Sequence, residues 1–336
     1  MSVRHLIRAG LVLIILSLAG FGLWLATLPA TPAAVAPPAV APAETDAMLA
    51  ALKPPKRTRP LVAVVGINDA TETTDYLMPT GILRRADIAD VMMLSTGSDP
   101  VKLYPALSVE ADATTETFDA RHPEGADYVI VPAMSRDDDP AVTGWLRQQA
   151  KGGAVIVAIC AGAKVVAAAG LLDDRRATTH WYYLNDLLER HPSIRYVADR
   201  RMVVDRGVAT TTGITASMPM MLTLIEAIAG RAKAEAVAGD LGLDRWDARH
   251  DSSAFRLTRP FAMTVLGNRL AFWNGDRFGI VLEPGVDEVS LALIADAWSR
   301  TYRSGVELFA TSPAAVTTRN GVRLLPDHAT AAWAGE

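Results

Sequence analysis

Residues 154–180, AVIVAICAGAKVVAAAGLLDDRRATTH, decide the fold of this chain. The segment opens with a short run rich in Val and Ile after Gly152 and Gly153, which is typical of a strand buried on both faces. Ala-rich helix formers follow, and Gly170 stands where a helix C-cap is expected. Cys160, the sole cysteine among 336 residues, lies at the junction. The segment therefore predicts a strand, a tight turn that carries Cys160, and a helix.

The position of Cys160 on this turn bears on its chemistry. A side chain there projects above the edge of the sheet, and the N–H groups that begin the helix point toward it. Both features favour the thiolate over the thiol. The alternative is a buried cysteine that acts as a small apolar side chain, which is the commoner situation in a context rich in Ala and Val. The turn position favours a reactive thiol.

Three short segments around the turn resemble the ThiJ/PfpI superfamily: ICAG at 159–162, AGLL at 169–172 and ATTHW at 177–181. They are most similar to the ligand-sensing domains of GlxA-type regulators of the AraC family and to isocyanide hydratases. The resemblance covers residues 61–239. It implies an α/β domain with a doubly wound parallel sheet, flavodoxin-like and of the class I glutamine amidotransferase type, with a nucleophile on the turn.

The resemblance also implies three catalytic residues. Members of the superfamily have a nucleophilic cysteine on the turn, many have a histidine about twenty residues later, and an acid lies four positions before a proline. Cys160 and His180 fit the first two positions, and Asp75, which precedes Pro79, fits the third. His180 is equally compatible with a structural role, capping the turn before Trp181.

Residues after the neighbouring strands complete the expected binding site: Ala133, Met134, Ala161, Gly162, Thr179, Gly213 and Thr215. Many members have Gly-Gly at the position of Ala133 and Met134, where backbone amides help to form an oxyanion hole. Met134 is expected to crowd the pocket and to resist a positive φ, which argues against acyl transfer. Isocyanide hydratases usually carry Thr where this chain has Ala161, which argues against that activity.

The pattern of apolar runs supports the implied fold. Strands alternate with helices, which predicts a parallel, doubly wound sheet with Cys160 at the carboxyl edge of its strands. The predicted strands span 61–67, 91–95, 128–131, 154–159, 202–205 and 208–211, and the predicted helices span 75–86, 141–150, 182–190 and 218–229.

The N-terminal region is predicted to be a membrane anchor. Residues 9–28 are strongly apolar and long enough to cross a bilayer, and Arg4 and Arg8 place residues 1–8 in the cytoplasm. The run exceeds the core of a usual signal peptide, although a cleaved signal peptide remains the alternative. Either interpretation puts the body outside the cytoplasm. We expect a single-pass protein of the inner membrane with a periplasmic body.

Residues 29–60 form the predicted linker. The segment contains eight prolines and many alanines, which predicts an extended, semi-rigid spacer without a packed core. Basic residues gather at its far end: Lys53, Lys56, Arg57 and Arg59. We interpret them as solvated, with contact to anionic lipid as the alternative.

The last part of the chain repeats the start of the domain. Residues 279–310, GIVLEPGVDEVSLALIADAWSRTYRSGVELFA, match Glu72 with Glu288 and Arg84 with Arg300 without a gap. We expect a connector over 240–260 and a half-repeat over 261–336, which ends in a hairpin around Asn320-Gly321 at 316–325. Leu291 replaces Asp75 in this copy, so the acid is lost. Because a half-domain cannot bury both faces alone, it should pack on the first domain or on another protomer.

Composition narrows the function. A net charge of −4 and a pI near 5.9 leave no basic surface for nucleic acid, and the tail lacks the paired helix-turn-helix pattern of the regulators. A single cysteine excludes an internal disulfide, and no zinc-like spacing of His and Cys occurs, so we expect no metal and no cofactor.

Three hypotheses follow from these features. The first is a membrane-tethered sensor, expected to be a homodimer, whose pocket binds a small molecule or whose Cys160 is oxidised. The second is a cysteine-dependent hydrolase, hydratase or lyase acting on a small electrophile. The third is a scaffold in which the site is a relic.

Overall fold

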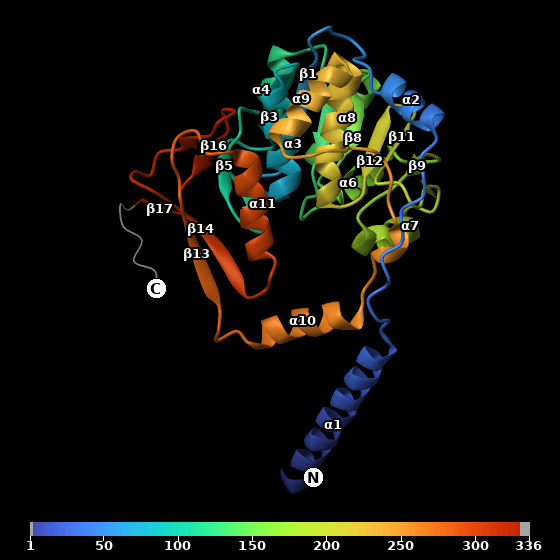
Figure 1. Cartoon of the computed structure of the whole chain (residues 1–336). Coiled ribbons are helices and arrows are strands. Elements are labelled where there is room, and N and C mark those ends of the chain that lie inside the picture. The colour runs from blue at the N-terminus through green and yellow to red at the C-terminus, as the bar shows by residue number, and fades with distance from the viewer. Residues whose placement is uncertain (1–2, 330–336) are drawn as a thin grey trace.

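The computed structural model describes residues 3–329. At its centre lies a seven-stranded sheet in which every neighbouring pair is parallel except the edge pair β11–β12 (Figure 1). The expected doubly wound parallel sheet is therefore confirmed. In spatial order the strands are β11 (Met202–Asp205), β12 (Val208–Thr211), β8 (Val155–Ala158), β7 (Tyr128–Val131), β1 (Leu61–Gly66), β3 (Asp90–Ser95) and β6 (Ala113–Thr114).

Helices cover both faces of this sheet, and alternate residues of each strand feed two separate cores. In β1, for example, Val62 and Val64 belong to one core, while Ala63 and Val65 belong to the other. The first core lies under α3 (Thr73–Ala86), α8 (Ser217–Ala229) and α9 (Arg231–Asp240). The second lies under α4 (Thr115–Arg121), α5 (Pro140–Lys151), α6 (Gly162–Ala168) and α7 (Leu184–Arg190).

Short elements complete the first domain around the carboxyl edge of the sheet. They are β2 (Asp69–Glu72), the hairpin of β4 (Val101–Tyr104) and β5 (Ser108–Glu110), the parallel pair β9 (Arg176–Ala177) and β10 (Arg195–Tyr196), and the 3₁₀ turns Trp181–Tyr183, Ile214–Ala216 and Ser252–Ala254.

The C-terminal segment repeats the arrangement of the first strands. It comprises α10 (Arg259–Leu270), β13 (Asp276–Val281), α11 (Glu288–Ser299), β14 (Ser304–Ala310), β15 (Val316–Thr317), β16 (Arg323–Leu325) and β17 (His328–Ala329). Its parallel sheet has the order β13-β14-β17, which reproduces β1-β3-β6 of the first domain. Helix α11 packs against α3, so the half-repeat packs on the first domain, which was one of the two expected places.

The two copies meet around a local two-fold axis. Strand β16 pairs antiparallel with β5, with Leu324 opposite Val109 and Leu325 opposite Ser108. The gapless alignment of the copies matches Ser108 with Leu324 and Val109 with Leu325. Exchanging the copies therefore turns one pair into the other, as in an isologous dimer. The half-repeat lies against the first domain as the second subunit of such a dimer would.

Helix α1 (Val3–Thr27) precedes the body. Its most apolar window has a mean hydropathy of 2.3 and none of its residues is buried. Length and composition suit a membrane span, and an N-terminal signal sequence would satisfy the same criteria.

The prediction of a linker without packed structure was wrong for residues 42–52. Helix α2 (Pro42–Ala51) begins with Pro at its first position, where the missing N–H is tolerated, and continues through Ala-rich helix formers. It packs near α8 and β11, and Leu52 directly after it is fully buried. Four prolines before this helix and three after it masked the local helix propensity.

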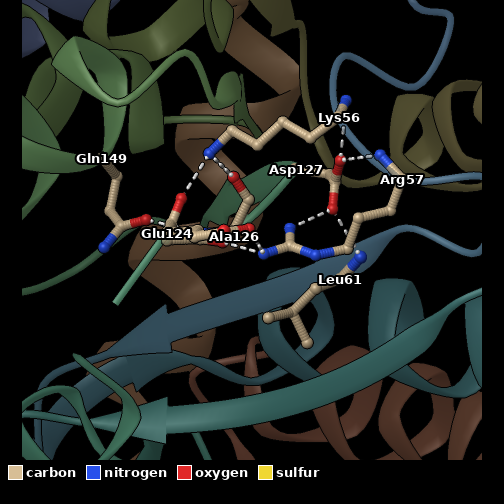
Figure 2. Close-up of polar contacts among 8 residues, drawn as sticks. Lys56, Arg57, Leu61, Glu124, Ala126, Asp127 and Gln149 are labelled. Carbon is tan, nitrogen blue, oxygen red and sulfur yellow. Dashed lines mark hydrogen bonds and ion pairs between the residues drawn. The ribbon is translucent and has the colours of Figure 1, made fainter. Parts of the chain in front are cut away.

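Lys53, Lys56 and Arg59 are exposed, which agrees with the interpretation of these basic residues as solvated, whereas Arg57 is partly buried. Figure 2 shows Lys56 and Arg57 bound to the segment before β7. The Lys56 ammonium donates to two backbone carbonyls, and the buried Asp127 carboxylate accepts hydrogen bonds from the backbone N–H of Lys56, Arg57 and Leu61. Arg59 pairs with Asp87 and Asp90 on the surface. These contacts fix the chain at the entrance to β1.

We therefore expect Asp127→Ala to lower the free energy of unfolding by about 3–5 kcal/mol, because three backbone donors and the Arg57 guanidinium lose a buried partner. Glu124 is the matched control. Its side chain is 84% exposed and lies 3.7 Å from the same guanidinium, so Glu124→Ala should cost less than about 1 kcal/mol. Urea unfolding followed by tryptophan fluorescence measures both. Equal costs would contradict the role given to Asp127.

Candidate functional site

Cys160 lies between β8 and α6, on the turn that the sequence predicts. Its φ is +55°, in the left-handed region that a side chain other than glycine rarely adopts. Two threonines hold this backbone. The Cys160 N–H donates to the Thr211 hydroxyl at 3.0 Å, and the Thr179 hydroxyl donates to the Cys160 carbonyl at 3.1 Å. Thr179 was an expected site residue, whereas Thr211 was not.

Gly162 allows the turn to close. A Cβ at this position would lie 2.0 Å from the Val131 carbonyl oxygen and 2.9 Å from that of Pro132, so no other residue fits without moving β7. Gly162 thus brings the start of α6 against the end of β7. Ala161 is the N-cap of this helix, and its N–H is oriented to stabilise a thiolate at Cys160.

Asp75 lies in the first turn of α3 and is completely buried. Its Oδ2 accepts the Ala133 N–H at 3.1 Å, while its Oδ1 has no hydrogen-bond partner among residues 3–329. Burial raises the pKa of Asp75 well above its usual value, and the Glu72 carboxyl adds to the rise. Burial therefore favours the protonated form of Asp75, and its Oδ1 is free to carry the proton.

Glu72 was not predicted to belong to the site, and it holds the first turn of the helix that carries Asp75. Its Oε2 accepts the Asp75 N–H at 2.6 Å and the Thr74 hydroxyl at 2.8 Å, which makes it the N-cap of α3. Burial raises the pKa of Glu72 to about 7; Asp296 adds to the rise, and Arg300 opposes it. The carboxyl thus changes its charge in the physiological range.

Arg300, at the end of α11, brings the half-repeat into the site. Its guanidinium donates to Glu72 Oε1 at 2.6 Å and to Asp296 at 2.5 Å, and lies over the Tyr104 ring. The contact between Arg300 and Tyr104 has a weaker two-fold counterpart. In it the Arg84 guanidinium donates to the carbonyl of Asn320, the residue that aligns with Tyr104. The alignment of the two copies identified Arg300 as the counterpart of Arg84, but it did not predict the contact between Arg300 and Glu72.

The environment of the thiol differs from the sequence-based expectation. Burial raises the pKa of Cys160 well above its usual value, and the carboxyls of Asp75 and Glu72 raise it further. The Ala161 N–H and Arg300 oppose this effect but do not outweigh it. Cys160 is 6% exposed, so desolvation of the charged form outweighs the favourable turn position. The expected preference for the thiolate was wrong.

His180 lies at the rim of the same edge. Its Nδ1 accepts the Tyr182 N–H at 3.3 Å, and its ring is so close to Gly213 that a Cβ there would lie 2.9 Å from it. Burial lowers the pKa of His180 to about 4, and the charge of Arg300 contributes. The ring is therefore neutral at pH 7. It caps the turn before Trp181, and within the described part of the chain its hydrogen bond goes to Tyr182 rather than to the thiol.

The remaining predicted site residues occupy different surroundings. The Ala133 N–H is engaged by Asp75 and is not a free oxyanion donor. Met134 packs against the core on the opposite face of the sheet from Cys160, so it does not crowd the thiol, contrary to expectation. Thr215 is exposed on the turn before α8. Among residues 3–329, no group of three or more His, Cys, Asp or Glu side chains is arranged to hold a metal ion.

The Glu72–Arg300 pair predicts a pH-dependent loss of stability. At pH 5 the Glu72 carboxyl is protonated, so Arg300→Met removes a hydrogen bond to Glu72, together with the ion pair to Asp296 that is lost at either pH. At pH 8 the carboxylate is charged and loses its counter-ion, and the loss should grow to about 1–3 kcal/mol, less than for a fully buried pair because Arg300 is 37% exposed.

Arg277 provides the matched control, because it pairs with Glu307 at 2.5 Å and is 76% exposed. Arg277→Met should change stability little at either pH. Thermal unfolding at pH 5 and pH 8 measures these differences, and a loss for Arg300→Met that is the same at both values would contradict the assignment.

Known proteins resemble this chain in sequence and in fold. The chain is 28% identical over 184 residues to the Parkinson disease protein 7 homolog of Danio rerio, covering 53% of this chain and 95% of the relative. It is 39% identical over 149 residues to an isonitrile hydratase of Pseudomonas putida, covering 43% of this chain and 63% of that protein. The crystal structure of Drosophila melanogaster DJ-1beta superposes with a TM-score of 0.50 at 23% identity, covering 56% of this chain and all of that one.

The match to the family model falls within the first domain and leaves the half-repeat and α1 outside it. The solved structure supports the fold, and the sequence relatives support the ancestry inferred from the segment around Cys160. Residues 62–227 match the model of the DJ-1/PfpI family, and the chain therefore carries a DJ-1/PfpI family domain, as the resemblance to the ThiJ/PfpI superfamily indicated.

Proposed function

We propose that this protein is a membrane-anchored sensor in which Cys160 is reversibly oxidised by a small peroxide. The observation that carries the proposal is the buried Asp75 carboxyl, whose Oδ1 has no hydrogen-bond partner among residues 3–329 and whose burial favours its protonated form. A protonated carboxyl cannot activate a thiol by accepting its proton. It can donate a hydrogen bond to an oxygen that forms on the sulfur.

The proposed step is a two-electron oxidation. The Cys160 sulfur attacks one oxygen of the peroxide, an S–O bond forms and the O–O bond breaks. The thiol proton passes to the leaving oxygen, so that hydrogen peroxide yields sulfenic acid and water. Sulfur is oxidised and peroxide is reduced. With 6% of Cys160 exposed, only a small oxidant can approach.

The surroundings of Cys160 favour sensing over acyl transfer. Acyl transfer needs donors aimed at a developing oxyanion, and the Ala133 N–H that could serve is engaged by Asp75 at 3.1 Å. The raised pKa of Cys160 also keeps the thiolate population low at neutral pH. A sensor does not need rapid turnover. Slow oxidation of Cys160 is therefore compatible with an engaged Ala133 N–H and with a small thiolate population.

The proposed anchor is supported by α1, whose most apolar window has a mean hydropathy of 2.3 and none of whose residues is buried. With Arg4 and Arg8 at its start, the proposed orientation has a cytoplasmic N-terminus and a body outside the cytoplasm, in a single-pass protein of the inner membrane. The α3 face is covered by α11, so a homodimer must use another surface.

A second candidate is hydration of a small electrophile such as an isonitrile, favoured by the 39% identity to the isonitrile hydratase. Ala161 after the cysteine and the engaged Ala133 amide are less suited to this reaction. In it Cys160 would attack the electrophile and His180 would shuttle protons.

Peroxide treatment of the full chain followed by dimedone trapping tests the proposal. We expect one adduct, at Cys160, which is absent from Cys160→Ser. Because the pKa of Cys160 is raised, the trapping rate should still climb above pH 9, and Asp75→Asn should shift this climb to lower pH, because the Asp75 carboxyl is one of the groups that raise the pKa of Cys160. Asp69→Asn, on the exposed end of β2, is the control and should leave the profile unchanged.

The same preparation should show no steady hydration of an isonitrile. Turnover that is lost in Cys160→Ser would favour the second candidate. A thiol that neither forms the adduct nor turns over isonitrile would leave the sensor proposal without support.

A further inference from the structure

Helix α10 and the turn after it form an exposed apolar surface outside the DJ-1/PfpI domain. None of the residues of α10 is buried. Five large apolar side chains on this segment are between about half and four-fifths exposed: Phe261 49%, Met263 50%, Leu270 60%, Phe272 82% and Trp273 76%. Exposed aromatic and aliphatic groups at this density mark a surface that binds something apolar.

The repeat explains why no residue of this helix is buried against the body. In chain order α10 precedes β13 as α2 precedes β1. In the first copy α2 packs near α8, a helix from the second half of the domain. The half-repeat ends before any counterpart of α8 in the described part of the chain, so α10 has nothing equivalent to pack on.

The charge of the segment indicates the kind of partner. Residues 252–275 contain Arg256, Arg259 and Arg269 and no acid. Phe272 and Trp273 follow directly after the helix, stacked edge to face with their centroids 5.1 Å apart. Aromatic side chains together with arginines and no acids are typical of helices that lie in the headgroup region of an anionic bilayer.

The position of α10 agrees with this partner. The Arg259 side chain donates to the carbonyls of Leu25 and Ala26 in the last turn of α1 and of Leu28 just after it, where helical carbonyls lack some of their intrahelical partners. The Arg259 N–H donates to the Pro29 carbonyl at 2.8 Å. Figure 1 shows α10 below the body, starting near the end of α1 and running from there toward β13. If α1 spans a bilayer, α10 begins where α1 leaves it.

We propose that α10 and the Phe272-Trp273 turn lie in the headgroup region of an anionic lipid bilayer, as a second membrane contact beside α1. This inference rests on the proposed anchoring by α1. Phe261 in the first turn of α10 also contacts Trp181, with ring centroids 6.3 Å apart, next to His180. Binding of α10 to the bilayer therefore turns the carboxyl edge of the sheet, where Cys160 lies, toward the membrane surface.

Site-directed spin labelling of the full chain tests the proposal, because Cys160→Ala leaves no other cysteine. In this background, nitroxides are placed through Phe272→Cys or Leu270→Cys, both at exposed positions whose replacement removes little packing. The protein is reconstituted into nanodiscs of phosphatidylcholine and phosphatidylglycerol. Collision rates with oxygen, which concentrates in lipid, and with a water-soluble nickel chelate are then compared.

Two matched labels calibrate the measurement. Leu16→Cys in α1 reports the hydrocarbon interior, and Ala120→Cys on the exposed surface of α4 reports water. We expect the labels at 270 and 272 to collide more often with oxygen than with the nickel chelate, as at Leu16→Cys, and the label at Ala120→Cys to show the reverse. Replacing phosphatidylglycerol by phosphatidylcholine should lower the oxygen preference at 270 and 272 only.

The two proposals fail in distinguishable ways. A lipid-like label at Leu16→Cys together with water-like labels at 270 and 272 would overturn the second contact and leave the anchor intact. Water-like labels at all three positions would overturn both. Labels at 270 and 272 shielded from both colliders would point to a protein partner, such as a second copy of the chain, and would also overturn the proposal.

Discussion

The ion pair between Glu72 and Arg300 connects the two copies of the repeat to the chemistry of Cys160. Glu72 caps α3, fixes Asp75 through its backbone N–H, and is balanced by a guanidinium that arrives from α11. Without that charge, a buried carboxyl beside another buried carboxyl would hold its proton to still higher pH. The protonation of the acids next to the thiol therefore depends on a segment far away in the sequence. This dependence gives the half-repeat a physical role, although it has lost the acid and carries no second turn of the Cys160 type.

The same segment explains two features of the architecture. By placing α11 on α3 and β16 beside β5, the chain covers a face of its DJ-1/PfpI domain with a copy of that face. Because the half-repeat ends before an equivalent of α8 among residues 3–329, its own α10 remains uncovered and meets the end of α1 instead. One incomplete duplication thus produces both a covered face and an exposed one. The exposed face lies on the side where α1 joins the body.

The fold and the position of Cys160 on a tight turn were predicted well from the sequence, because both depend on residues that are close together in the chain. The apolar run before Cys160 and the glycine two residues after it require a strand, a turn and a close approach to β7, and all three are present. The roles of Glu72 and Arg300 were not predictable in this way, because they depend on contacts between segments more than two hundred residues apart. The protonation of Cys160 was mispredicted for a related reason: turn geometry favours the thiolate, whereas burial, which depends on the whole fold, disfavours it. Helix α2 was missed because prolines on both sides concealed a short stretch of helix formers.

The most direct test of this account is the protonation of Glu72, observed through the infrared band of the protonated carboxyl as a function of pH. The band that disappears in Glu72→Gln belongs to this group. In the wild type we expect it to titrate near pH 7, and in Arg300→Met at a higher pH, because the opposing charge is gone. A Glu72 band that titrates near the ordinary value of 4.5 in both proteins would show that α11 does not control the acids beside Cys160.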